Sequence, residues 1–277
     1  MASKSRMRVG DDGRPANVVG KWAIEKHERV RRYTGITSSV RRKFLTGQSK
    51  SAAYVELYCA TGRSYIEDTD EFVEGSPLIA WRESVAKNAP FSEVIIADAN
   101  PEHAKICRDR LLEAGAPVTM LSGVAEKTVH EACELLNPHG YHFAFIDPYS
   151  LKSLPFSIID ALCTIKRIDL LIHVSSQDLQ RNFGGFITGA LDGLDEFAPG
   201  WRDVITNDTP QRQRHAVLEY WKHLISQSGG KRTAEGIERI TGPKNIHLYW
   251  LVLASGHPRA EEFWDKVRRT ESQIDLF

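Results

Sequence analysis

From residue 51 onward, short apolar runs alternate with amphipathic stretches. The apolar runs predict five buried strands, at residues 53–58, 93–97, 118–121, 142–146 and 168–174. The amphipathic stretches between them predict helices over residues 76–88, 100–115, 124–136 and 156–165. Alternating strands and helices are typical of a parallel sheet with helices on both faces. We therefore expect an α/β fold with a Rossmann-like, doubly wound sheet.

Two of these helices carry a start signal. Ser76-Pro77 and Asn100-Pro101 each place a capping side chain immediately before a proline. A capping oxygen accepts from free backbone N–H groups, and proline fits the first helical turn. We expect Ser76 and Asn100 to cap their helices.

The last third of the domain has a different pattern. Residues 176–235 contain a glycine-rich stretch, which predicts a loop excursion, and then a helix over 211–227. Residues 236–241 and 245–253 flank the turn signal Gly242-Pro243, which predicts a hairpin, and a helix over 261–269 closes the chain. Five parallel strands followed by a hairpin give a strand count similar to that of class I methyltransferases.

The first 50 residues differ from the rest. Residues 1–20 lack periodicity and predict a mobile arm, residues 21–50 predict a basic helical segment, and residues 51–277 form the main domain. Residues 1–50 hold 13 Lys or Arg against 4 Asp or Glu, a net of +9, so the remainder carries −9. The basic segment either binds an anionic partner, DNA or RNA, or docks on the acidic body of its own chain. The candidate nucleic-acid contacts are Lys26, Arg29, Arg31, Arg32, Arg41, Arg42 and Lys43.

Composition narrows the class of protein. The chain has 277 residues, 42% hydrophobic and 26% charged, which excludes a disordered chain and a disulfide-stapled miniprotein. Its four cysteines lie far apart and show no metal-ligand spacing, so we expect no metal site and a reducing, cytoplasmic location. No apolar run approaches the roughly 20 residues of a membrane span, and no secretory signal is visible.

The turn after the first strand is the first candidate ligand site. Ligands of such sheets bind beyond the carboxyl ends of the strands. Glu56 ends the strand, and either orders the turn or binds a ligand amine. Methyltransferases place glycines two, four and six residues after this acid, where this chain has Tyr58, Ala60 and Gly62. An ordinary strand-to-helix turn is the alternative.

Two later strand ends extend this candidate cofactor site. Asp98 closes the second strand, where a carboxylate accepts from both ribose hydroxyls of an adenosine cofactor or else caps the next helix. Ser122-Gly123 closes the third strand and is a candidate adenine contact. Glu56 and Asp98 are separated by 42 residues, and the polar stretch 63–75 accounts for the excess length as an insertion.

Asp147-Pro148-Tyr149 closes the fourth strand and is the candidate catalytic motif. It is similar to the Asp-Pro or Asn-Pro pair of amino-methyltransferases, which accepts hydrogen bonds from the target amine while an aromatic ring stacks on the base. Positioning would supply most of the rate. A simple Asp-Pro turn is the alternative.

The order of these blocks resembles one known family, the three-Cys-motif partner proteins (TcmP), over residues 21–270. The resemblance rests on Glu25-Lys26-His27 with Tyr33, on the blocks at 54–63, 75–78 and 145–149, and on 248–258 with Phe263-Trp264. It implies a methyltransferase fold and a partner protein whose three-cysteine motif suggests an iron–sulfur or radical enzyme. The chain departs from the family pattern at Ala60 and Ser150, which replace glycine.

Two functional hypotheses follow. The first is an S-adenosylmethionine-dependent methyltransferase-like protein that acts on a nucleic-acid amine, with S-adenosylmethionine as cofactor. The second is a non-catalytic partner that keeps the fold and works with a three-Cys-motif protein.

Overall fold

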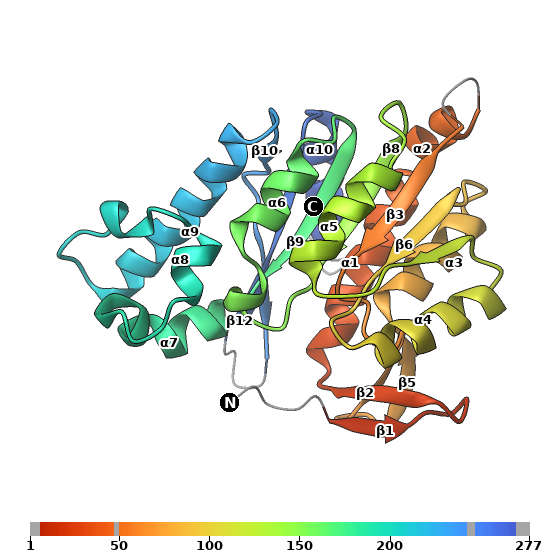
Figure 1. Ribbon diagram of the computed structural model, residues 1–277, viewed down its shortest axis with the longest axis horizontal. Helices are drawn as coiled ribbons and strands as arrows, with labels where there is room; N and C mark the ends of the chain where they lie inside the picture. The colour runs from red at the N-terminus through yellow and green to blue at the C-terminus, as the bar shows by residue number, and fades with distance from the viewer. Residues whose placement is uncertain (1–5, 47–49, 243–246, 270–277) are drawn as a thin grey trace, which may run out of the picture.

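In the part of the chain that the structure describes, the main sheet has eight strands. The computed structural model describes residues 6–46, 50–242 and 247–269. Five parallel strands run in the order β7-β6-β3-β8-β9 (Figure 1). Their bounds are β3 (Ala52–Glu56), β6 (Glu93–Ile96), β7 (Val118–Met120), β8 (Tyr141–Ile146) and β9 (Ile168–Val174).

The predicted hairpin lies against the end of this parallel set. The strand β12 (His247–Ser255) runs antiparallel to β9, and both β11 (Glu238–Thr241) and β10 (Arg232–Thr233) pair with its other side. The doubly wound α/β fold with a C-terminal antiparallel hairpin is thus confirmed. The very short β10 was not predicted, and residues 243–246 of the turn lie outside the described residues.

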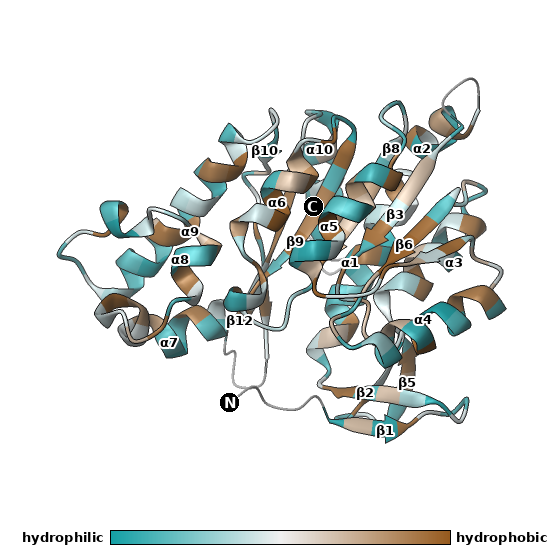
Figure 2. Ribbon diagram, in the orientation of Figure 1, coloured by the Kyte–Doolittle hydropathy of each residue, from teal (hydrophilic) through white to brown (hydrophobic). Residues whose placement is uncertain are grey.

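Helices cover both faces because the side chains of each strand alternate between two cores. Ala52 and Tyr54 face one core, and Ala53 and Val55 face the other. The first core is covered by α1 (Trp22–Ile36), α3 (Ser76–Ala86), α4 (Pro101–Glu113) and α10 (Arg259–Arg268). The second is covered by α5 (Ala125–Leu135), α6 (Phe156–Cys163), α7 (Ser176–Thr188) and α9 (Pro210–Gln227). Figure 2 shows the main-sheet strands as largely apolar ribbons within this helical cover.

A second, four-stranded sheet contains part of the segment predicted as a mobile arm. In it β1 (Met7–Val9) pairs with β2 (Pro15–Val19), β2 runs parallel to β4 (Arg63–Ile66), and β4 pairs with β5 (Glu71–Glu74). The expected insertion at 63–75 is therefore a hairpin that pairs with the N-terminal segment. Such short strands carry almost no periodicity, and their partners lie far apart in sequence, so the pattern did not reveal them.

Residues 176–206 differ from the predicted loop excursion. They contain α7, the short α8 (Gly193–Phe197) and a 3-10 turn, Trp201–Val204. Gly185 lies inside α7, where a Cβ would come within 2.8 Å of Leu191, so this glycine allows close packing rather than ending the helix.

Other helical boundaries follow the sequence more closely. Asn100 caps α4 as predicted, because its side chain accepts from the backbone N–H of Glu102 at 3.0 Å. Ser76 does not cap α3: Gly75 occupies the cap position and Ser76 is the first helical residue. The helix α2 (Ser38–Leu45) follows α1 directly. Within the described residues, no helix is both long enough and apolar enough to cross a bilayer.

Candidate functional site

The parallel register gathers the predicted site residues at one edge of the main sheet. The carboxyl ends of β3, β6, β7, β8 and β9 all point to the lower edge in Figure 1. Glu56, Asp98, Ser122 and Asp147 follow or end these strands, so they share this edge. Ser122 and Gly123 lie at its outer end, beyond β7, and Gly123 has a positive φ of 135°.

Asp98 holds the loop after β3 in place. Its Oδ2 accepts from the backbone N–H of Ala60 at 3.0 Å, and its Oδ1 accepts from that of Asn100 at 2.8 Å. Ala60 and Gly62 have positive φ values of 48° and 73°, so the turn uses the left-handed region at both positions. Since Asn100 provides the helix cap, Asp98 instead connects two strand-end loops. A carboxylate offers about four acceptor sites, so it retains capacity for a ligand hydroxyl.

Glu56 is part of the framework beneath that loop. Its side chain is buried and accepts hydrogen bonds from Tyr54 Oη at 2.5 Å and Ser76 Oγ at 2.6 Å. Burial raises its pKa to about 8, although both hydrogen bonds oppose that shift. Both oxygens have partners within the chain, so the geometry favours the first alternative, in which Glu56 orders the turn and the start of α3.

Asp147 forms the charged centre of the edge. Its Oδ2 lies 2.5 Å from Lys26 Nζ on α1, and its Oδ1 lies 3.4 Å from His173 Nδ1 at the end of β9. Burial would raise the pKa of Asp147, but the charge and the hydrogen bond of Lys26 outweigh it, and the pKa is lowered. Burial lowers the pKa of His173 to about 4, so the imidazole is neutral near pH 7. Asp147 is therefore an ionised carboxylate that holds an amine of its own chain.

Aromatic side chains surround this charged centre. The Tyr249 ring centroid lies 5.9 Å from Lys26 Nζ and 4.3 Å from the His173 ring, and Tyr249 donates to the carbonyl of Trp22. Tyr149 is 67% exposed beside Asp147, which leaves its ring free to stack on a planar ligand. The hydroxyl of Tyr58 donates to the carbonyl of Ser153, which joins the loops after β3 and β8.

The seven predicted nucleic-acid contacts separate into three groups. Lys26, Arg29 and Arg41 point inward: Lys26 binds Asp147, Arg29 pairs with Glu238 at 2.6 Å, and Arg41 is fully buried. Arg31 is exposed and Arg32 is half-buried, and both line a pocket that also contacts α3 and α10, whereas Arg42 and Lys43 are exposed on α2. The contacts of Lys26, Arg29 and Arg41 are therefore those expected if the basic segment docks on its own chain.

Sequence reasoning missed the role of Arg110 on α4. Its buried guanidinium donates to Asp12 at 2.8 and 2.9 Å, to the Pro15 carbonyl at 3.0 Å and to the Thr61 carbonyl at 2.6 Å. The small sheet is thereby tied to the loop that Asp98 holds. These partners are 49 to 98 residues away in sequence, so no local pattern marks them.

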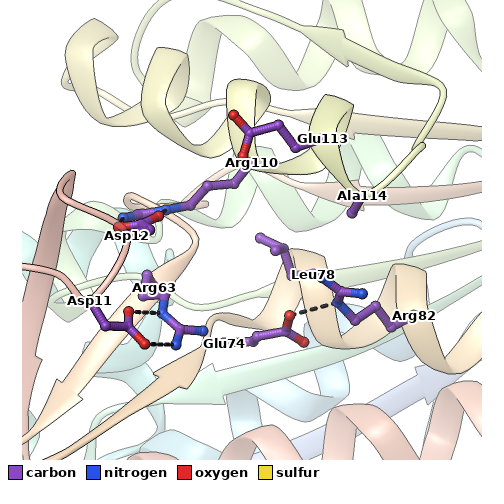
Figure 3. Close-up of a pocket in the computed structure, with 9 residues that line it drawn as sticks. All are labelled: Asp11, Asp12, Arg63, Glu74, Leu78, Arg82, Arg110, Glu113 and Ala114. Carbon is purple, nitrogen blue, oxygen red and sulfur yellow. Dashed lines mark hydrogen bonds and ion pairs between the residues drawn. The ribbon is translucent and has the colours of Figure 1, made fainter.

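A pocket of about 230 Å³ lies beside Arg110, between the small sheet, α3 and α4. Figure 3 shows paired charges around it, with Asp11 bound to Arg63 and Glu74 bound to Arg82. Because Arg110 also has its acid, this pocket is charge-matched and is best described as a structural junction. Within residues 6–46, 50–242 and 247–269, no cluster of side chains suited to a metal ion is present.

Comparison with known proteins supports the fold. The chain matches no family model and no curated protein sequence. A solved Legionella pneumophila protein of the family model DUF519 is similar, with a TM-score of 0.53 and 13% identity over 90% of this chain and 91% of that one. An O-methyltransferase from Bacillus cereus in complex with SAH has a TM-score of 0.43 and 12% identity, covering 81% of this chain and 80% of that one.

A putative O-methyltransferase from Klebsiella pneumoniae has a TM-score of 0.45 and 14% identity, covering 85% of this chain and 87% of that one. The Legionella likeness, together with the strand order, supports an α/β, Rossmann-like fold. At such identities the fold alone is shared.

Proposed function

We propose that this protein transfers a methyl group from S-adenosylmethionine to an amine. The observation that carries the proposal is Asp147, an ionised, largely buried carboxylate that already holds the ammonium of Lys26 at the carboxyl edge of the sheet. A target amine could replace Lys26 at the same oxygen. The carboxylate would then orient the nitrogen and keep its proton within reach, since positioning supplies most of the rate.

The edge also fits the cofactor. Asp98 keeps acceptor capacity for ribose hydroxyls, and it lies beside the left-handed turn at Ala60 and Gly62, where Ala60 is half-buried. Ser122 and Gly123 lie one strand further along, where an adenine would reach. S-adenosylmethionine, when bound, supplies an electrophilic methyl on a sulfonium. The chain's own residues would bind and orient the target amine. As the nitrogen takes the methyl group and S-adenosylhomocysteine leaves, Asp147 would accept the proton that the nitrogen releases.

We assign the acceptor to the amines of nucleic-acid bases. Tyr149 offers an exposed ring for stacking beside Asp147, and Arg42 and Lys43 are exposed cations for the phosphate backbone. The TcmP resemblance, with a three-Cys-motif protein as partner, belongs to the second candidate function below.

A non-catalytic partner role is the second candidate. Lys26 occupies Asp147, both oxygens of Glu56 are used within the chain, and Ala60 replaces a glycine of the methyltransferase pattern. A protein that kept the fold and lost the reaction would tolerate all three.

Calorimetry with S-adenosylmethionine and S-adenosylhomocysteine tests cofactor binding. Asp98→Asn keeps the shape of the side chain but removes its charge, so we expect roughly ten-fold weaker binding. Asp203→Asn, an exposed change far from the edge, is the matched control and should leave binding unchanged. If the wild-type protein gives no heat with either ligand at millimolar concentration, cofactor binding is wrong.

Methyl transfer is then followed with labelled cofactor and short single-stranded DNA and RNA. Asp147→Asn should retain cofactor binding but lose about 100-fold or more of transfer, because the acceptor nitrogen is no longer positioned. Cofactor binding without transfer by the wild-type protein would overturn the enzymatic proposal and favour the partner role.

A further inference from the structure

A second pocket lies on the opposite side of α1 from the candidate site, between α1, α3 and α10. It measures about 240 Å³ and is lined by Arg31, Arg32, Gly35, Ile36, Glu83, Lys87, Lys266 and Val267. The four cationic residues come from three helices that are far apart in sequence. Folding therefore brings together like charges that local sequence would keep apart.

The lining is strongly positive. Four cations face a single lining carboxylate, Glu83, whose side chain is only 11% exposed. Glu83 lies 3.6 Å from Arg31 and 3.7 Å from Lys87, both longer than hydrogen bonds. Arg31 also binds Glu28, which is outside the lining, at 2.6 Å. The four cations thus have two carboxylates near them, Glu28 on Arg31 and Glu83 at a longer distance, which leaves an excess of positive charge in the pocket.

The arginines are held in position before any ligand arrives. Arg32 donates to the backbone carbonyls of Lys266 and Arg269 at the end of α10, at 3.2 and 3.0 Å. Backbone carbonyls accept from Arg32 without neutralising its formal charge, and a cation is favourable at the C-terminal end of a helix. Arg31 is held differently, because both oxygens of the Glu28 carboxylate accept from it and offset its charge. Lys87 and Lys266 are exposed at the rim.

We infer that this pocket binds a phosphoryl group. A guanidinium has five N–H donors, so Arg31 and Arg32 keep donors for phosphate oxygens beyond those already bound, and the two ammonium groups add point charges. A volume of about 240 Å³ is below the ~300–1,000 Å³ typical of pockets for whole cofactors. One phosphoryl group, from a nucleic-acid backbone or from a free phosphorylated molecule, fits this size and charge. The inference does not depend on methyl transfer.

Calorimetry with inorganic pyrophosphate tests the site. The double variant Lys87→Gln, Lys266→Gln removes the two rim cations and leaves both arginines. The control Lys105→Gln, Lys166→Gln removes the same charge from exposed positions outside the lining. We expect the pocket variant to bind pyrophosphate about ten-fold or more weakly and the control to change it less than about two-fold.

Melting curves and a second probe complete the experiment. Both double variants should have the melting temperature of the wild-type protein. If the pocket variant melts lower, the single variants Lys87→Gln and Lys266→Gln are measured in its place. Labelled single-stranded DNA separates the two sources of the phosphoryl group. If the DNA competes with pyrophosphate and the pocket variant loses affinity for both to the same extent, the site binds a backbone phosphate. If the pocket variant loses affinity for pyrophosphate alone, the site binds a small phosphorylated molecule. Equal weakening in the pocket and control variants, or no pyrophosphate binding by the wild-type protein, overturns the site. Cofactor calorimetry on the same variants keeps this result separate from the proposed methyl transfer.

Discussion

At the scale of single residues, two carboxylates at one edge of the sheet have opposite electrostatic states. Burial raises the pKa of Glu56 to about 8, so this carboxyl is protonated near pH 7, whereas Lys26 keeps Asp147 ionised. Sequence placed both acids at strand ends but could not distinguish them. The distinction depends on Tyr54, Ser76 and Lys26, and Lys26 comes from a helix 121 residues before Asp147.

Glu56→Gln should reduce the pH dependence of stability. The pKa of Glu56 is raised from 4.5 to about 8, so the folded state binds its proton more tightly than the unfolded chain does. The free energy of unfolding should therefore fall as pH rises from 4.5 to about 8, by at most about 1.4 kcal/mol per pH unit. Urea denaturation of Glu56→Gln should give a flatter profile between these values, while the exposed control Glu131→Gln follows the wild-type curve. A variant curve parallel to the wild-type curve would contradict the raised pKa.

Lys26→Met should destabilise the fold by about 2–3 kcal/mol. That is below the ~3–5 kcal/mol of a fully buried pair, because the Asp147 side chain is still 19% exposed. The double variant Lys26→Met, Asp147→Asn should recover most of the loss, since no uncompensated charge remains. Because the pKa of Asp147 is lowered, the pair contributes above the ordinary value of 3.8 and is lost as pH falls through the lowered pKa. Additive losses in a double-mutant cycle would show that the two side chains are not coupled.

At the scale of elements, the strongly periodic segments were predictable and the short ones were not. The buried strands β6, β8 and β9 follow from runs such as Val94–Ile96, whose only stable place is a two-sided core. The strands β1, β2, β4 and β5 are short and partly exposed, and their pairing depends on contacts such as Arg110 with Asp12. Such long-range contacts leave no periodic trace in the sequence.

Arg110→Met should release the small sheet from the main body. The variant removes an ion pair to Asp12, whose side chain is 30% exposed, and two bonds to the backbone carbonyls of Pro15 and Thr61, a loss of about 2–4 kcal/mol. Hydrogen exchange should accelerate across residues 7–19, while the amides of β8 keep their protection until global unfolding. Arg108→Met, which breaks a neighbouring and more exposed pair with Asp109, is the matched control and should cost less than about 1 kcal/mol. Uniform acceleration across both sheets would mean that the small sheet is not a separate unit.

At the scale of the whole molecule, the net charge of +9 on residues 1–50 and the net charge of −9 on residues 51–277 offset each other in part within the fold. Arg29 pairs with Glu238, Lys26 with Asp147 and Arg14 with Glu113, and each pair links residues 1–50 to the acidic body. Sequence left open whether the basic segment serves a partner or the chain itself. Its side chains differ in this respect, because a helix packed on a sheet has one face toward the protein and one toward solvent: Arg29 and Arg41 are buried, and Arg42 and Lys43 are exposed.

Neighbouring cations of α2 should therefore respond in opposite ways to substitution. Arg41 is fully buried, donates to the carbonyls of Ala89 and Thr34, and lies over the Phe91 ring at 4.4 Å. Arg41→Met leaves those carbonyls without a donor, so we expect a loss of about 2–4 kcal/mol, seen as a lower melting temperature.

Arg42 and Lys43 are exposed on the same helix, so Arg42→Glu with Lys43→Glu should leave the melting temperature nearly unchanged. If this outward face binds nucleic acid, that variant should weaken the binding of single-stranded DNA. For each phosphate that the variant no longer neutralises, the slope of log affinity against log salt should also become shallower by about 0.7. An electrophoretic shift assay across salt concentrations, beside melting curves of both variants, measures the two effects separately. Unchanged DNA affinity and salt slope in the Arg42, Lys43 variant would remove α2 from any nucleic-acid interface, and an unchanged melting temperature in Arg41→Met would contradict its structural role.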